Sequence, residues 1–309
     1  MTFARQAKLF LTFGSLVAST LALPWSQKPL GNDEDDDTPL PVVVWHGLGD
    51  HYAADGLKEV GHLIEAANPG TLVYFIRMDE SASQDRTATF FGNLTEQVQK
   101  ACDDIAAHPI LSTAPAIDAL GFSQGGQFLR AYHNGIIDFK ACGATDFLCK
   151  GAMSLLRGNT FSQFVQSRLV PAQYFRDPAA NFDRYLEASN FLADINNERV
   201  LKNETYRDNI IKLVNFAMYI FEEDTTVIPK ETAWFEEVNG TEVIPLRARD
   251  LYREDWIGLR ELDRKGGLKF RTAPGEHMRL SGELLVEAFG EFFGPFGKKF
   301  ADSEREDEL

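Results

Sequence analysis

The chain has 309 residues and a formal net charge of −15, from 46 acidic residues against 31 lysines and arginines. Ten of the acids lie in two short runs, residues 33–37 and 302–308, so the body between them is only weakly acidic. It has no basic stripe, which argues against a nucleic-acid partner. A chain of this length can bury the core of one domain with an insertion.

The first residues have the pattern of a secretory signal peptide, which we place at residues 1–23. Arg5 and Lys8 precede an apolar run that ends at Leu23, with small residues near Ala22 for cleavage. This run is short and interrupted, although a signal anchor is the alternative. No later stretch reaches the ~20 apolar residues that cross a bilayer, so we expect no transmembrane segment.

The acidic, proline-flanked residues 24–40 predict a disordered linker, and residues 297–309 predict an acidic tail. The final residues 307–309 match the ER-retrieval signal, with an ordinary acidic tail as the alternative. The signal peptide therefore predicts the secretory pathway, with retention in the ER or secretion both open. Within that pathway three sequons become candidate N-glycosylation sites, at Asn93, Asn203 and Asn239.

Helices and buried strands alternate through the first half of the chain. The pattern predicts strands at 41–45, 71–76 and 117–120, with helices at 56–67 and 94–105 between them. This alternation is typical of an α/β fold with a parallel, doubly wound sheet. In such a sheet the functional site lies at the carboxyl ends of the strands.

Strand signals disappear across residues 142–213, where helical segments at 152–156, 161–168, 179–192 and 206–216 predict an insertion. They return at 214–221 and 268–271, and an amphipathic helix at 280–293 ends the predicted hydrolase domain, residues 41–296. The insertion's apolar residues either line a channel for a long acyl chain or pack the insertion's own core. For any single one of these residues we favour packing in the core. These residues are Phe161, Phe164, Val165, Leu169, Val170, Tyr174 and Phe175.

A Gly-x-Ser-x-Gly sequence lies between a predicted strand and a predicted helix, with Ser123 at its centre. This placement is that of a nucleophile elbow, where Gly121 and Gly125 let strand and helix approach closely. A five-residue match alone is often a plain glycine-rich turn. The strand before it and the helix after it favour the nucleophile.

A serine nucleophile needs a base within hydrogen-bond reach and an acceptor that holds the base. α/β-Hydrolases place these residues in the order Ser, Asp, His, after successive strands. His277 follows the last predicted strand, and Asp224 follows the one before it. Glu222 and Glu223 compete with Asp224, but Asp224 directly precedes the turn away from the strand.

The glycine-rich loop after the first strand would supply one N–H of an oxyanion hole, and the residue after the nucleophile would supply the other. This predicts the backbone N–H groups of Leu48 and Gln124 as donors. His46, beside the loop, is expected to be a positioning residue rather than the base. Because the histidines are scattered and the cysteines are not in metal-binding pairs, we expect no metal and no cofactor.

The chain closely resembles the lysosomal palmitoyl-protein thioesterase family, from about residue 41 to 294. The resemblance is carried by residues 44–50, 121–130, 191–199 and 275–277. It implies an α/β-hydrolase that cleaves the thioester between a long fatty acyl chain and cysteine in S-palmitoylated proteins. It further implies Ser123, Asp224 and His277 as the triad, an acyl groove formed by the insertion, and a lysosomal or vacuolar location. We expect the protein to be a monomer. We also expect from it a disulfide between Cys142 and Cys149.

One departure from the family follows the nucleophile helix, where about twenty residues are absent and Tyr132 is followed at once by His133. Cys102 resembles a half-cystine whose partner belongs in that segment. Residues 129–139 are also too few for a helix to end and return a parallel strand, since such a crossover needs a dozen or more residues. We therefore expect the strand beside Ser123 to be missing and the chain to fold or act poorly.

Two other functions stay open at this point. A lipase or carboxylesterase needs the same residues for oxygen esters, and a comparison of matched thioester and oxygen-ester substrates separates it. A non-catalytic lipid-binding protein would bind acyl chains without turnover, whether or not Ser123 is replaced.

Overall fold

The computed structural model describes residues 37–130, 136–137, 150–152, 154, 159–177, 181–239 and 242–298. Several predictions concern residues outside these ranges. They are the signal peptide, the linker up to residue 36, the Cys142–Cys149 disulfide and the tail from residue 299.

β1 (Val42–Trp45) lies between β2 (Val73–Phe75) and β3 (Asp118–Gly121) in a three-stranded parallel sheet. All four β1 residues are buried, as their β-branched run predicted for a strand covered on both faces. The register pairs Trp45 with Gly121, so the carboxyl end of β1 lies beside the segment that leads to Ser123. The three strands predicted in the first half are thus confirmed.

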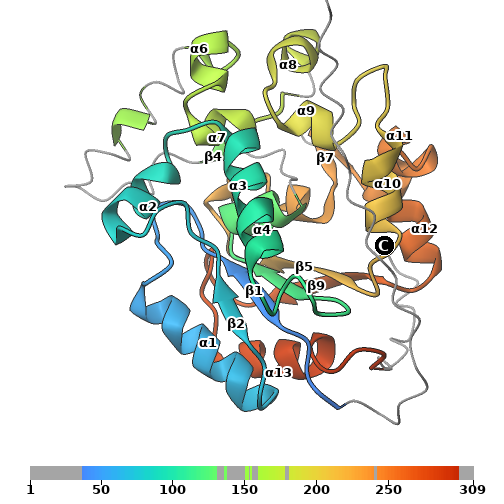
Figure 1. Cartoon of the computed structure of the whole chain (residues 1–309). Helices are drawn as coiled ribbons and strands as arrows, with labels where there is room; N and C mark the ends of the chain where they lie inside the picture. The colour runs from blue at the N-terminus through green and yellow to red at the C-terminus, as the bar shows by residue number, and fades with distance from the viewer. Residues whose placement is uncertain are drawn as a thin grey trace, which may run out of the picture. The chain divides into compact units, whose positions relative to one another are not determined.

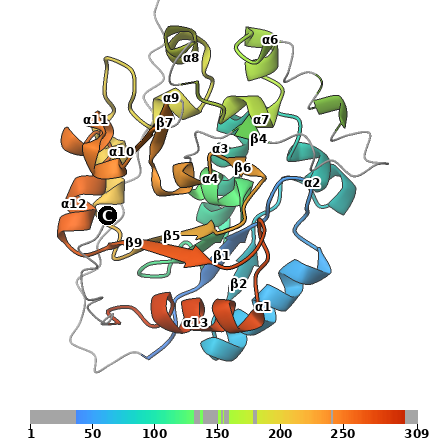
Figure 2. The ribbon, with the colours of Figure 1, turned by 180° about the vertical axis from the view of Figure 1, so that it is seen from behind.

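Helices cover both faces of this sheet: α1 (Asp55–Ala67), α3 (Leu94–Ala107), α4 (Gln124–Arg130) and α13 (Gly282–Phe292). Val42 and Val44 pack into one cluster with apolar residues of α1 and α13. Val43 and Trp45 point the other way and pack with residues of α3 and α4. The period-two alternation of β1 therefore serves two cores, and Figures 1 and 2 both show α1 and α13 together below the strands.

A second parallel pair, β5 (Phe216–Phe221) and β9 (Leu268–Ala273), is paired over six residues. Its apolar cluster is separate and includes Ile210, Met218, Leu262 and Leu268. The surrounding elements are α10 (Glu204–Ile210), η2 (Lys230–Trp234), η3 (Leu246–Ala248), α11 (Asp250–Arg253) and α12 (Leu259–Arg264). The predicted late strands are confirmed, and β9 extends two residues beyond its predicted end.

Among the described strands, none pairs with the edge of β3 that faces away from β1. The chain after α4 instead contributes β4 (Ile136–Ile137), which pairs antiparallel with β6 (Val227–Ile228). β4 has two residues and pairs antiparallel with β6, so it is not the parallel strand that a crossover after α4 would add beside β3. The parallel sheet is therefore described in two pieces, β2-β1-β3 and β5-β9. The order of strands and helices along the chain, and the helices that cover the sheet, are those of an α/β-hydrolase, as predicted.

The insertion contains α6 (Gln163–Gln166), α7 (Val170–Gln173), α8 (Phe182–Ala188) and α9 (Leu192–Ile195), which both ribbon views place at the end opposite α1 and α13. Buried Gln173 joins this region to the core: its Oε1 accepts from the Leu94 N–H at 2.8 Å, and its Nε2 donates to the Gly92 carbonyl at 2.8 Å. Of the seven candidate channel residues, Val165, Leu169, Val170 and Tyr174 are buried in packing clusters, whereas Phe164 is 60% exposed.

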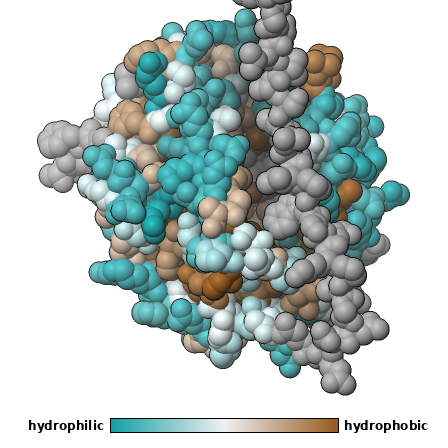
Figure 3. Space-filling view, in the orientation of Figure 1, coloured by the Kyte–Doolittle hydropathy of each residue, from teal (hydrophilic) through white to brown (hydrophobic). Residues whose placement is uncertain are grey.

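Two predicted helices differ from the structure. The helix expected at 179–192 is interrupted after Ala188, and the helix expected to run from Tyr206 to Phe216 ends at Ile210 so that β5 can begin. The hairpin of β7 (Glu237–Asn239) and β8 (Glu242–Ile244) was not predicted. The loop between α9 and α10 exposes Val200 (95%) and Leu201 (90%), and Figure 3 shows a brown group at that loop, in the upper right.

Candidate active site

Ser123 lies on a sharp turn between β3 and α4 with a φ of 51°, in the left-handed region that residues other than glycine rarely adopt. The glycines around it permit this turn. A Cβ on Gly121 would lie 2.3 Å from the Gly126 Cα, and one on Gly125 would lie 2.2 Å from the Trp45 carbonyl oxygen. No larger residue fits at either position, so the Gly-x-Ser-x-Gly pattern follows from the close approach of strand and helix.

A chain of hydrogen bonds joins Ser123, His277 and Asp224. The Ser123 Oγ lies 2.9 Å from His277 Nε2, and His277 Nδ1 lies 2.7 Å from Asp224 Oδ2. Since Nδ1 faces a carboxylate, it carries the ring proton, which leaves Nε2 as the acceptor toward the serine hydroxyl. The serine comes from the β3 side of the sheet, and the other two residues follow β5 and β9.

The Asp224 carboxylate is held in a fixed orientation. Its Oδ1 accepts from the N–H groups of Thr226 at 2.8 Å and Val227 at 2.9 Å. Burial would raise the pKa of Asp224, but the hydrogen bonds from His277 and from these amides outweigh it and lower the pKa. The neighbouring Glu222 and Glu223 are exposed, and among the described residues neither side chain hydrogen-bonds to His277.

The loop that carries His277 is packed against the end of β5. The Glu223 N–H donates to the Gly275 carbonyl at 3.0 Å, and Gly275 itself has a φ of 89°. The Phe221 ring contacts the imidazole edge to face, with centroids 6.0 Å apart. These contacts fix the ring of His277 in the plane that reaches both Asp224 and Ser123.

The two predicted oxyanion donors belong to loops that approach Ser123 closely. A Cβ on Gly47 would lie 3.4 Å from the Ser123 Cβ, so the loop containing Leu48 passes directly beside the nucleophile. Over the described part of the chain, the N–H groups of Leu48 and Gln124 have no hydrogen-bond acceptor. Both donors are thus available to a third group beside Ser123.

His46 lies away from the triad and pairs with buried Asp85, with Nε2 3.0 Å from Oδ2. Asp85 also accepts from the N–H groups of Met78 at 2.6 Å and Tyr52 at 2.8 Å. Burial opposes its ionisation, but the hydrogen bonds from His46 and the two amides lower the pKa of Asp85. His46 therefore anchors the start of the glycine-rich loop, in agreement with a positioning residue.

The side chain of Gln124 takes part in a buried network that the sequence did not indicate. It is 1% exposed, and its Nε2 donates to the Thr89 carbonyl at 3.0 Å and to the Tyr174 hydroxyl at 3.1 Å. Burial raises the pKa of Tyr174, so this phenol stays neutral. No sequence signal could have found these partners, because they lie 35 and 50 residues from Gln124.

The predicted glycosylation sites differ in their surroundings. Asn203 is exposed at the start of α10, whereas Asn93 is half-buried at the start of α3, where its Nδ2 donates to Glu96 and its Oδ1 accepts from Asn190. Asn239 ends β7, and its side chain lies outside the described part of the structure. Cys102 is an exposed free thiol on α3.

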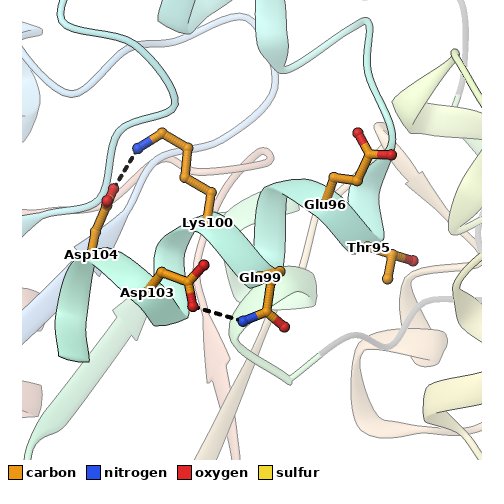
Figure 4. Close-up of a pocket in the computed structure, with 6 residues that line it drawn as sticks. All are labelled: Thr95, Glu96, Gln99, Lys100, Asp103 and Asp104. Carbon is orange, nitrogen blue, oxygen red and sulfur yellow. Dashed lines mark hydrogen bonds and ion pairs between the residues drawn. The ribbon is translucent and has the colours of Figure 1, made fainter. Parts of the chain in front are cut away.

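Figure 4 shows a surface depression along α3 whose lining residues are polar and partly paired with one another on the same helix. Lys100 pairs with Asp104 at 2.6 Å, and Gln99 donates to Asp103 at 2.8 Å. This is a solvated helix face that shares no residue with the triad. Within the ranges described, no group of three or more His, Cys, Asp or Glu residues could hold a metal ion, and no helix is long and apolar enough to cross a membrane.

Comparison with known proteins places this geometry in a family context. The family model "Palmitoyl protein thioesterase" matches residues 41–277. Palmitoyl-protein thioesterase 1 of Caenorhabditis elegans is 34% identical over 269 residues, which cover 80% of this chain and 89% of the relative. Palmitoyl-protein thioesterase 3 of Dictyostelium discoideum is 32% identical over 253 residues, with 77% and 84% covered. Lysosomal thioesterase PPT2 of Homo sapiens is 27% identical over 248 residues, with 74% and 78% covered.

The nematode alignment also contains an unmatched part. It spans 269 positions, whereas 80% of the 309 residues of this chain is about 247. About 22 positions of the alignment therefore hold no residue of this chain.

Proposed function

The chain belongs to the palmitoyl protein thioesterase family, and on that premise we propose that it hydrolyses long-chain fatty acyl thioesters of S-palmitoylated proteins, with Ser123 as nucleophile. The observation that carries the proposal is the hydrogen-bonded series Asp224, His277 and Ser123, with the serine on a strained turn at a φ of 51°. Nucleophile, base and orienting carboxylate then have the geometry that acyl transfer requires.

In the proposed mechanism, Ser123 Oγ attacks the thioester carbonyl while His277 Nε2 accepts its proton. The N–H groups of Leu48 and Gln124 stabilise the oxyanion of the tetrahedral intermediate. Collapse of the intermediate breaks the carbon–sulfur bond, and the cysteine leaves as a thiol with the proton from His277. Water, deprotonated by His277, then attacks the acyl-serine, and His277 returns the proton to Ser123 Oγ as the carbon–oxygen bond breaks and the fatty acid leaves.

A thiolate is a better leaving group than an alkoxide, so proton donation by His277 matters less for a thioester than for an oxygen ester. The ionised Asp224, whose pKa is lowered, stabilises the imidazolium that forms in either case. The match to the palmitoyl protein thioesterase family, rather than the triad geometry, favours the thioesterase over a lipase or carboxylesterase as the main activity of the site.

The relatives named lysosomal thioesterases favour a lysosomal or secretory-pathway location for this chain. Delivery to a lysosome or vacuole is the finer proposal, with ER retrieval through residues 307–309 and secretion as its alternatives. We further propose that the protein acts as a monomer. Fractionation of cells that express the tagged full chain, with and without Leu309, separates the destinations.

The test of the activity compares two substrates that share a palmitoyl group and differ only in sulfur or oxygen at the scissile bond. We expect a kcat/KM for the thioester at least ten times that for the oxygen ester, and no turnover of either by Ser123→Ala. A higher kcat/KM for the oxygen ester would assign the site to a lipase or carboxylesterase. Binding of palmitate without turnover by any form of the protein would instead indicate a lipid-binding protein.

A further inference from the structure

Thr89, directly after α2 (Ala82–Ala88), contacts both loops of the candidate oxyanion hole. It is 5% exposed. Its Oγ1 accepts a hydrogen bond from the Gly49 N–H at 2.9 Å, and its carbonyl oxygen accepts one from Gln124 Nε2 at 3.0 Å. Gly49 directly follows the proposed donor Leu48, and Gln124 is the other proposed donor, so Thr89 contacts the neighbour of one donor and the side chain of the other.

The direction of the hydroxyl hydrogen bonds is fixed by chemistry. The Gly49 N–H can only donate, so Thr89 Oγ1 must accept from it, and the hydroxyl proton is left for the Arg86 carbonyl at 2.7 Å. On the other side of the same glycine, the Arg86 Nε donates to the Gly49 carbonyl at 2.8 Å. Both peptide groups of Gly49 are therefore held by the end of α2.

The Gln124 side chain is equally determined. Its Nε2 faces the Thr89 carbonyl, which only accepts, so the amide nitrogen and not the amide oxygen must point there. The second amide proton faces the Tyr174 hydroxyl at 3.1 Å. Because the side chain is buried, its two hydrogen bonds restrict the backbone of Gln124 at the first turn of α4.

We propose that Thr89 is a positioning residue that sets the separation between the Leu48 and Gln124 N–H groups. It acts through its hydroxyl on one loop and through its carbonyl on the other, without touching the substrate. The inference rests on the proposed function, because it concerns the oxyanion of the same acyl-transfer reaction. An oxyanion hole stabilises the transition state only when both donors reach the position that the oxyanion will occupy.

The hydroxyl contribution can be removed with little change of shape. Thr89→Val replaces the hydroxyl with a methyl group and breaks the bond to Gly49, whereas Thr89→Ser keeps the hydroxyl and loses the methyl group. We expect Thr89→Val to lower kcat for the palmitoyl thioester by about ten- to a hundredfold with KM within about threefold, less than the 10²–10³ of a lost donor. Thr89→Ser should stay within about threefold of the unchanged chain in both constants.

A second readout does not depend on the thioester. Alkyl fluorophosphonates phosphonylate an active serine and place their P=O oxygen where the oxyanion forms. The rate of Ser123 labelling, located by peptide mass spectrometry, should fall in Thr89→Val and be kept in Thr89→Ser. Thermal melting of all three proteins shows whether the loss follows stability instead.

The outcomes separate the two claims. Slow labelling of Thr89→Val alone, with no thioester hydrolysis by any form, would support the positioning role and remove the proposed substrate. Equal losses in Thr89→Val and Thr89→Ser would overturn the positioning role, since packing alone would then explain them. Full labelling and kcat in Thr89→Val would also overturn it, as would the absence of Ser123 labelling in the unchanged chain.

Discussion

The two parallel pieces of the sheet contribute different parts of the site. The β2-β1-β3 piece supplies Ser123 and the loops with the oxyanion donors, whereas the β5-β9 piece supplies Asp224 and His277. Each piece has an apolar cluster of its own. The described residues provide no strand hydrogen-bonded to both pieces, so no β-ladder holds the joint between these two pieces, which the triad spans.

α13 is the clearest packing connection across that joint. It follows β9 and the His277 loop in the chain, yet its residues Leu285 and Phe289 pack with Val42 and Val44 of β1. Side-chain packing, rather than a continuous ladder of hydrogen bonds, therefore sets the distance between Ser123 and His277. Catalysis here should therefore depend strongly on contacts far from the triad.

Within the second piece, Asp224→Asn should have the largest effect on activity. Asparagine fits the same space. Its amide nitrogen favours the wrong tautomer of His277, and its lack of charge removes the stabilisation of the imidazolium. We expect kcat to fall by about 10⁴, the size of effect that such a change has in other triads. Measurement of kcat at several pH values, beside a melting curve, tests this expectation; a loss below tenfold would contradict the role of Asp224.

Phe289→Ala and Leu262→Ala form a matched pair that tests the joint. Phe289 is buried in the cluster shared by α13 and β1, whereas Leu262 is buried in the cluster of the second piece alone. We expect each to cost about 2–5 kcal/mol in the free energy of unfolding. Well below both melting temperatures, Phe289→Ala should also lower kcat more than Leu262→Ala does.

Urea unfolding measures the loss in the free energy of unfolding, and hydrolysis of the palmitoyl thioester measures kcat. Equal kcat values in the two variants would show that α13 does not set the distance between Ser123 and His277.

A smaller effect is expected at the other end of β3. Burial raises the pKa of Asp118 to about 7, although the Gly294 N–H and Lys298 partly offset it. Between about pH 4 and pH 7 the folded state then binds more protons than the unfolded state, so stability falls as pH rises through this window. Asp118→Asn should remove this slope and raise Tm at pH 7.5 by about 2–4 °C, with little change at pH 4.5.

Calorimetry of both proteins across that pH range measures the slope directly. An unchanged slope in Asp118→Asn would mean that other groups titrate in the window.

The strands of the parallel sheet were predicted correctly from local sequence pattern, whereas the helices predicted at 179–192 and 206–216 were not. The β-branched run of β1, the glycines around Ser123 and the order of Asp224 and His277 along the chain each follow from local geometry or chain order. The Thr89 contacts could not be predicted, since they join segments 35 to 40 residues apart. The early end of α10 at Ile210 reflects tertiary demand, because β5 pairs with β9 from Phe216 onward.

We propose that Ser123 hydrolyses the thioester where the two pieces of the sheet meet, a place that no strand among the described residues bridges. The most direct test measures hydrolysis of a palmitoyl thioester by the purified chain and by a version with a relative's segment inserted after Arg130, each beside its Ser123→Ala variant. We expect the insertion to raise both kcat and the cooperativity of melting, and Ser123→Ala to abolish turnover in both backgrounds. Turnover that survives Ser123→Ala, or full activity and cooperative melting without the insertion, would contradict this claim.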